Sequence, residues 1–343
     1  MNSVVTAANS VDAEGLAGRD IVVIGASAGG LQTLQTLVSG LPSDFPGTIF
    51  IVVHFAPDVR SMLDVILART SPLPVSMPED MTRFERGRIY VSTPDCHLLV
   101  EAEHVRVVRR PKENRHRPAI DPLFRSAAWS HGPRVVGVVL TGRLDDGAAG
   151  LWAIRTCGGV AVVQDPADAL HPDMPENALA MTEVDHCLPA AGIAPLLDRL
   201  ARTPIRAAPR SVPPAIGAEV DFVRLDGTRD MADLARIGRL SPFTCPSCRG
   251  ALFEMEDGDL LRFRCHTGHA FAGQSLVDEQ TRAIEDGLYA ALRAVEEKAE
   301  MLRRLGARSS THFPELQQRY AARAAEMERS AGVLRQLLAE GAL

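Results

Sequence analysis

Residues 19–30 read RDIVVIGASAGG, and this stretch decides the fold. Four consecutive β-branched residues at 21–24 predict a short strand that is buried on both faces. Glycines 25, 29 and 30 permit a sharp turn, and a helical pattern follows from about Leu31. A buried strand that turns at once into a helix is typical of an α/β fold with a parallel sheet.

Further apolar runs alternate with helical patterns as far as residue 201. They are Thr48–Val53, Arg88–Val91, Val135–Leu140 and Val160–Gln164. This alternation predicts a doubly wound, mostly parallel sheet flanked by helices, a three-layer α/β/α domain over residues 19–201.

The flanking sequence predicts four other segments. Residues 1–18 form a flexible leader, and the proline-rich stretch that opens 202–239 indicates a linker. Residues 240–273 form a small Cys/His-rich module. Residues 274–343 carry helical spacing and predict a helical hairpin, with Ser275 and Asp278 marking its start.

Composition excludes several classes of protein. The 343 residues carry a formal net charge of -6 and only 5% aromatic residues, which disfavours nucleic-acid binding. The apolar runs are far shorter than the ~20 residues of a membrane span, so no membrane insertion is expected. The N-terminus lacks the pattern of a signal peptide, and six cysteines are too few for a disulfide scaffold. We therefore expect a cytoplasmic protein.

Three strand ends offer the residue types of a nucleophilic triad. Ser27 lies in a G-x-S-x-G turn after the first strand, His54 ends the second, and Asp145 and Asp146 follow Val135–Leu140. The carboxyl ends of parallel strands meet at one edge of a sheet, so these side chains are expected to converge. A serine needs a base and the base needs an orienting acid. The backbone amide of Ala28 is placed to stabilise an oxyanion.

The glycine-rich turn has two other interpretations. It could be a phosphate-binding loop at a helix N-terminus, or a plain turn of small residues. The spacing fits neither the dinucleotide fingerprint nor the P-loop, which also needs a lysine. A nucleotide-binding protein is therefore disfavoured.

Six motifs in order resemble the catalytic domain of the CheB family of chemotaxis protein-glutamate methylesterases. They are GASAGG, VHFAP, GRIYVSTPDCHLLV, HRPAIDPLFRSAA, LTGRLDDGAAGL and QDPADALHPDMPENAL, which span about residues 19–201. The resemblance implies a serine hydrolase without a catalytic cofactor. Enzymes of this family remove methyl esters from glutamates of the chemoreceptor cytoplasmic domain, and they also deamidate glutamines. The resemblance makes Ser27 the nucleophile, His54 the base and Asp146 the acid, with Asp145 as the alternative acid.

The sequence departs from this family in two places. Arg143-Leu144 stands where the family commonly has Met-Gly, which puts a cation beside the expected cleft. Ala28, Gly29 and Arg143 are the residues expected to contact the oxyanion or the substrate. The family's usual N-terminal receiver domain does not fit into the 18 residues before the first strand, so the expected enzyme is either constitutive or controlled through its C-terminal region. An alternative function is a signalling scaffold whose helices contact chemosensory pathway proteins.

A cysteine cluster predicts a structural zinc site. Cys245 and Cys248 form a C-x2-C pair, and Cys265 and His269 complete four soft ligands, with His266 as the alternative fourth. A reduced, metal-free β-hairpin and a redox-active cysteine pair are the other interpretations.

Two further groups of polar residues lie in segments that the resemblance places near the cleft. His97 is expected to pack within its loop rather than to border the cleft. His116, Arg117, Asp121 and Arg125 form a polar cluster that either lines a substrate groove or is a solvated loop and helix start.

Overall fold

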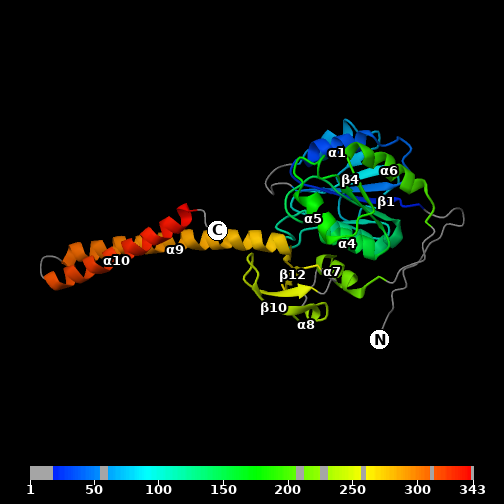
Figure 1. The fold of residues 1–343 in the computed structure, drawn as a ribbon. Helices are drawn as coiled ribbons and strands as arrows, with labels where there is room; N and C mark the ends of the chain where they lie inside the picture. The colour runs from blue at the N-terminus through cyan, green and yellow to red at the C-terminus, as the bar shows by residue number, and fades with distance from the viewer. Residues whose placement is uncertain are drawn as a thin grey trace. The chain divides into compact units, whose positions relative to one another are not determined.

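The structure, a computed structural model, describes residues 18–54, 61–205, 212–224, 231–255, 260–309 and 313–340. Its centre is a sheet that contains β1 and β4 (Figure 1). The sheet has seven strands in the order β3-β4-β2-β1-β7-β8-β9, and every neighbouring pair is parallel. The strands are β1 (Ile21–Ala26), β2 (Thr48–Val53), β3 (Val75–Ser76), β4 (Arg88–Val91), β7 (Val135–Val139), β8 (Val160–Gln164) and β9 (His186–Leu188). The predicted parallel sheet is confirmed.

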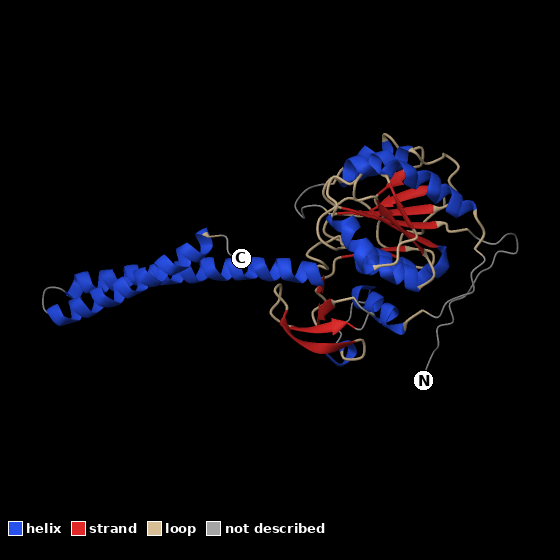
Figure 2. Cartoon of the chain, viewed as in Figure 1, coloured by secondary structure: helices blue, strands red, loops and turns tan. Residues whose placement is uncertain are grey.

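Helices cover both faces of the sheet (Figure 2). One face packs against α1 (Gly30–Ser39), α2 (Leu63–Ala68) and α6 (Ala190–Arg202), which bury aliphatic side chains such as Leu34 and Leu197. The other packs against α3 (Ile120–His131), α4 (Ala148–Thr156) and α5 (Asp173–Met181). The central strands are buried on both sides, which explains their nearly continuous Val and Ile content.

The order of the strands sets where a ligand can bind. From β1 the chain moves to β2 on one side, and later to β7 on the other side of β1. The carboxyl ends of β1, β2 and β7 therefore surround a topological switch point, where open α/β sheets bind their ligands.

Residues 97–134 join the two halves of the sheet. They contain the antiparallel hairpin of β5 (His97–Val100) and β6 (Val105–Val108), and a 3-10 turn at Gly132–Arg134 follows α3. All four residues of β5 are buried, whereas Arg106 and Val107 of β6 are partly exposed.

The interval 202–239, predicted as a linker, contains two helices, α7 (Pro214–Arg224) and α8 (Met231–Leu234). Ile216, Val220 and Val223 recur at helical spacing and are buried, so α7 has an apolar face that the proline-rich sequence before it obscured. Residues 206–211 and 225–230 lie outside the described residues, as do residues 1–17 of the expected leader.

A second sheet follows, antiparallel throughout, and it belongs to the same compact unit as the α/β layers. Its strands are β10 (Gly238–Thr244), β11 (Ala251–Met255), β12 (Arg262–Cys265) and β13 (Ala270–Ala272). We call residues 238–275 the Cys/His module.

The C-terminal unit, from Leu276 on, consists of the helices α9 (Gly273–Ser309), which begins just before it, and α10 (Pro314–Ala339). Ion pairs of Arg303 with Glu328 and of Arg335 with Glu296 join them in antiparallel order. The helix starts at Gly273 rather than at Ser275, whose hydroxyl bonds to Asp145 instead of capping the helix. No described helix is long and apolar enough to cross a bilayer.

Candidate active site

Ser27 is held by a turn that only small residues can form. It follows β1 directly, and its backbone N–H donates to the carbonyl of Thr141, 3.0 Å away. Gly29 has a φ of 76°, in the left-handed region, and a Cβ there would lie 3.0 Å from Leu170. A Cβ on Gly142 would lie 2.8 Å from that of Ser27. The half-buried serine is thus clamped between two loops.

His54, at the end of β2, lies between the serine and an acid. Its Nδ1 is 3.1 Å from Ser27 Oγ, and its Nε2 is 2.7 Å from Asp146 Oδ2. The imidazole is only 4% exposed, and burial lowers the pKa of His54 to about 3. It is therefore neutral at physiological pH. A proton on Nε2 donates to Asp146, which leaves the Nδ1 lone pair facing the serine.

The acid is Asp146, and it accepts hydrogen bonds on both oxygens. Oδ2 accepts from His54 and from the Ile120 amide at 2.7 Å, while Oδ1 accepts from Asn114 Nδ2 at 2.8 Å and from the Asp121 amide at 3.2 Å. Burial raises the pKa of Asp146, and these donors oppose the rise by stabilising the charged form. The alternative acid, Asp145, bonds instead to Gln274 and Ser275.

A second histidine stacks on the first. The rings of His54 and His116 lie 3.6 Å apart between centroids and 6° from parallel. Burial, and then the positive form of His54, lower the pKa of His116 to about 3. A neutral His116 therefore covers one face of the His54 ring.

Asp121 forms an acid pair with Asp146 across one amide group. Asn114 Nδ2 donates to Asp121 Oδ2 and to Asp146 Oδ1, at 2.8 Å each. Burial, and then the charge of Asp146, raise the pKa of Asp121 to about 7. Its other oxygen accepts from the amides of Gly147 and Gly150. Asp121 thus fixes the start of α4, behind the triad acid.

The polar cluster predicted around residues 116–125 is only partly correct. His116 lies at the triad, but Arg125 is 2% exposed and pairs with Glu113 and Glu219 in the interior. Neither a groove wall nor a solvated loop describes Arg125 or Asp121, because both are buried. His97 packs within its loop as expected, between the Pro111 carbonyl and the Ala119 amide.

The amides next to the serine have the position that an oxyanion site needs. The backbone N–H groups of Ser27 and Gly30 donate hydrogen bonds, whereas those of Ala28 and Gly29 have no acceptor among the described residues. Both amides adjoin the N-terminus of α1, whose dipole also favours negative charge. Arg143 is exposed on the loop that holds Ser27.

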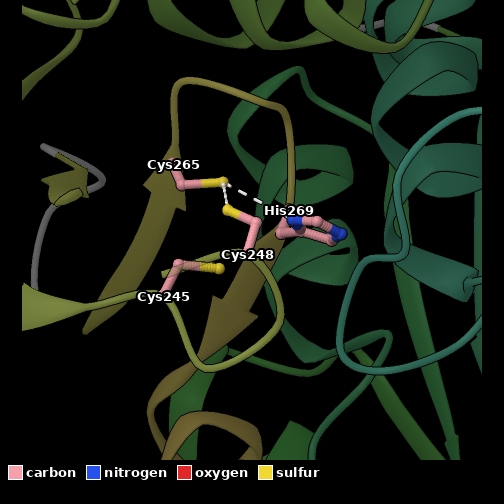
Figure 3. Close-up of side chains that lie close together, drawn as sticks. All are labelled: Cys245, Cys248, Cys265 and His269. Atoms are coloured by element: carbon pink, nitrogen blue, oxygen red, sulfur yellow. Dashed lines mark hydrogen bonds between the residues drawn. The ribbon is translucent and has the colours of Figure 1, made fainter. Parts of the chain in front are cut away.

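The Cys/His module gathers four metal-ligand side chains (Figure 3). Ligand atoms of Cys245, Cys248, Cys265 and His269 all lie within 4.8 Å of one another. Cys248 Sγ lies 3.6 Å from Cys265 Sγ, which in turn lies 3.6 Å from His269 Nδ1. Tetrahedral zinc, with bonds of about 2.3 Å to sulfur and about 2.05 Å to nitrogen, requires separations of about 3.8 and about 3.6 Å. The alternative ligand, His266, is exposed and not in this group.

Sequence reasoning missed Asn114, which bonds to both acids. Its signal was weak, because an asparagine inside a basic stretch suggests a turn, and it does have a φ of 46°. Nothing in the residue pattern indicates that its side chain points inward.

Known proteins share the α/β part of the chain. The profile of the family described as CheB methylesterase matches residues 22–197. A Geobacter metallireducens protein named protein-glutamate methylesterase/protein-glutamine glutaminase 4 is 39% identical over 183 residues, 52% of each chain. A Leptospira interrogans protein with the same two activities in its name is 36% identical over 182 residues, 53% of this chain and 94% of that one.

A solved structure agrees with these sequences. The crystal structure of the Thermotoga maritima CheB methylesterase catalytic domain matches with a TM-score of 0.51 and 31% identity, over 55% of this chain and 99% of that one. The chain spans about half the length of the Geobacter relative and nearly all of the Leptospira one. Since the profile covers just over half of the 343 residues and the fold agrees, the chain belongs to the CheB methylesterase family.

Proposed function

We propose that this chain is a serine hydrolase that removes methyl esters from glutamate side chains of chemoreceptor cytoplasmic domains. In this proposal Ser27 is the nucleophile, His54 the general base and Asp146 the orienting acid. The observation that carries it is the unbroken hydrogen-bonded series from Ser27 Oγ through both nitrogens of His54 to Asp146. The series lies where the strand order reverses, and the family supplies the reaction class.

The chemistry proceeds in two acyl-transfer steps. Ser27 Oγ attacks the ester carbonyl while His54 Nδ1 takes its proton, and the Ala28 and Gly29 amides stabilise the oxyanion. The imidazolium, stabilised by Asp146, then protonates the leaving methoxide, and methanol departs from an acyl-enzyme. Water attacks that ester with His54 again acting as base, which releases glutamate and restores the Ser27 hydroxyl.

The same intermediate accounts for the second activity in the relatives' names. A glutamine side chain attacked by Ser27 forms the identical acyl-enzyme, with ammonia as the leaving group instead of methanol. We propose deamidation as the lesser activity, because an amide is the less reactive acyl donor.

Methanol release from methylated receptor fragments tests the main proposal. Ser27→Ala should lower kcat by more than about 10³-fold, because removal of a triad nucleophile leaves only binding and oxyanion stabilisation. The matched control Ser130→Ala removes a hydroxyl that bonds to the Val100 carbonyl, away from the triad, and should keep full activity. A folded Ser27→Ala protein with wild-type turnover would refute the assignment.

We further propose that Cys245, Cys248, Cys265 and His269 hold a structural zinc ion. The hydrogen bond from Cys245 lowers the pKa of Cys265 and burial raises it, but with the hydrogen bond from His269 the net shift is downward, which favours the thiolate that zinc binds. Four protein ligands leave no open position, so the metal stabilises the fold without entering the reaction. One zinc per chain by elemental analysis, lost in Cys265→Ser, is the expected result.

The C-terminal helices are proposed to bind proteins of the chemosensory pathway in the cytoplasm. Helices α9 and α10 expose apolar side chains along their length, namely Val277, Ile284, Tyr289, Met301, Val333 and Leu337. Such side chains on a helix surface are typical of protein contacts.

A further inference from the structure

The Cys/His module contacts the acid end of the triad through Asn114. The Asn114 backbone N–H donates to the Ala270 carbonyl at 2.8 Å, and its Oδ1 accepts from the Ala272 amide at 2.7 Å. With its oxygen fixed by β13, the amide nitrogen of the same side chain donates to Asp146 and Asp121. The module thereby orients the group that bonds to Asp146 Oδ1.

A second contact reaches the neighbouring acid. Asp145 accepts from the Gln274 amide at 3.0 Å and from the hydroxyl of Ser275. Asp145 and Asp146 are consecutive residues in the loop before α4. Residues 270–275 therefore hold this loop at both of its acids, once directly and once through Asn114.

Buried ion pairs lock the module in this position. Glu113, next to Asn114, pairs with Arg264 of β12 and with Arg125 of α3. Glu219 of α7 pairs with Arg262 of β12 and with Arg125. All five side chains are at most 5% exposed. A movement of the Cys/His module would separate these ion pairs and leave buried charges without a partner. The module therefore has little freedom to shift.

Two of the four metal ligands adjoin the strands that contact Asn114 or pair with them. His269 immediately precedes β13, and Cys265 ends β12, to which β13 pairs from Arg262↔Ala272 to Arg264↔Ala270. A metal bound by these two residues closes the β12–β13 turn. The contacts then run from His269 along β13 to Asn114, and on to Asp146 and His54.

From these contacts we propose that the Cys/His module is a support of the active site, with Asn114 as the positioning residue and metal occupancy as the condition that keeps it in place. This inference rests on the proposed function of the triad. The family profile ends at residue 197, so the support comes from sequence outside the shared domain. Chains without metal populate the assembled triad less often, which lowers kcat and leaves KM unchanged.

The test compares the full-length protein with and without its metal. Zinc content is measured by elemental analysis, and kcat and KM by methanol release. The rate of Ser27 labelling by a fluorophosphonate gives a third readout. Chelation, or Cys248→Ser, should lower kcat and the labelling rate by about 10- to 100-fold, the worth of one hydrogen bond to a charged group, and zinc should restore the chelated protein. The control Cys187→Ser removes an exposed cysteine outside the cluster and should change nothing.

A double-mutant cycle separates this route from general loss of stability. Asn114→Ala should lower kcat about 10- to 100-fold with KM unchanged, and adding Cys248→Ser should cost no more, because both act through one contact. Multiplicative losses would overturn the route through Asn114. If Cys248→Ser fails to fold, Asn114→Ala alone decides, since unchanged turnover there refutes the proposal.

Three other results would overturn the inference, and one would affect only the proposed function. Wild-type protein that binds no zinc, metal-free protein with wild-type kcat, or equal labelling rates with and without zinc would each refute it. Wild-type protein that releases no methanol but labels at Ser27 in a zinc-dependent way would refute the methylesterase and support the coupling.

Discussion

Two groups of buried acids have pKa values that are shifted in opposite directions. Burial raises the pKa of Asp121 to about 7 and also that of Asp146, whose partners are mostly neutral donors. Burial acts in the same direction on Glu113 and Glu219, but Arg125, Arg262 and Arg264 outweigh it and hold both pKa values below the usual range. Arginines lie near both groups, but among the described residues only the glutamates form ion pairs with them, and these pairs decide the outcome.

This difference in pKa separates acids that take part in the reaction from acids that only stabilise the fold. The glutamates stay ionised over the whole physiological range, so they can fix the Cys/His module in place but cannot exchange protons. The acids behind His54 are stabilised by hydrogen bonds that leave them sensitive to a nearby positive charge, which is what a forming imidazolium provides.

The largest expected effect comes from neutralising the acid that contacts His54. Asp146→Asn should lower kcat by about 10³- to 10⁴-fold, because the amide no longer stabilises the imidazolium or fixes its tautomer. Methanol release measures it. Asp145→Asn is the matched control, since Asp145 has no contact with His54 and keeps an acceptor oxygen for Ser275; we expect at most about a 10-fold loss. Equal losses in both variants would mean that the acid is misassigned.

The structural group should show its effect in stability instead. Glu219→Gln leaves buried arginines short of one carboxylate and should lower the free energy of unfolding by about 3–5 kcal/mol. Glu85→Gln breaks the exposed pair with Arg88 and should cost no more than about 1 kcal/mol. Urea denaturation followed by circular dichroism distinguishes them. Two similar values would show that the buried pairs are not under the constraint that we infer.

A smaller effect is expected from the ring that covers His54. His116→Ala removes the stacked ring and should lower kcat/KM by about 2- to 10-fold. His116→Phe restores an aromatic face without a titratable group and should recover most of the loss. If the phenylalanine variant is as slow as the alanine one, the imidazole of His116 acts by its polarity and not by stacking.

The smallest effect is a near absence of change with pH. Because burial lowers the pKa of His54 to about 3, acidification from pH 6.5 to 5 should leave it neutral and change kcat/KM by less than about 2-fold. A base with the ordinary pKa of about 6.5 would lose about 16-fold over that interval. The pH profile of a Ser27-dependent ester hydrolysis decides. An inflection near pH 6.5 would show that His54 is more hydrated than its packing indicates.

The sequence allowed the sheet and the placement of Ser27, His54 and Asp146 to be predicted, because strand periodicity and strand ends are local patterns. The spacing of Cys245, Cys248, Cys265 and His269 also indicated that these four side chains lie together. The helix α7 was hidden behind a proline-rich stretch, and Asn114 and the Glu219 ion pairs depend on contacts between residues far apart in sequence. Such contacts leave no periodic pattern in the sequence, because the same residues on a surface would give the same local pattern.

The hydrogen bond between Asn114 and Ala272 joins positions 158 residues apart. At about 5–20 residues per second, a ribosome needs about 8–32 seconds to travel from one to the other. Once Asp146 has been added, the growing chain contains all three triad side chains but not yet the strand that fixes Asn114. Synthesis thus sets an order in time, in which the esterase gains its full support only after its catalytic side chains have been made.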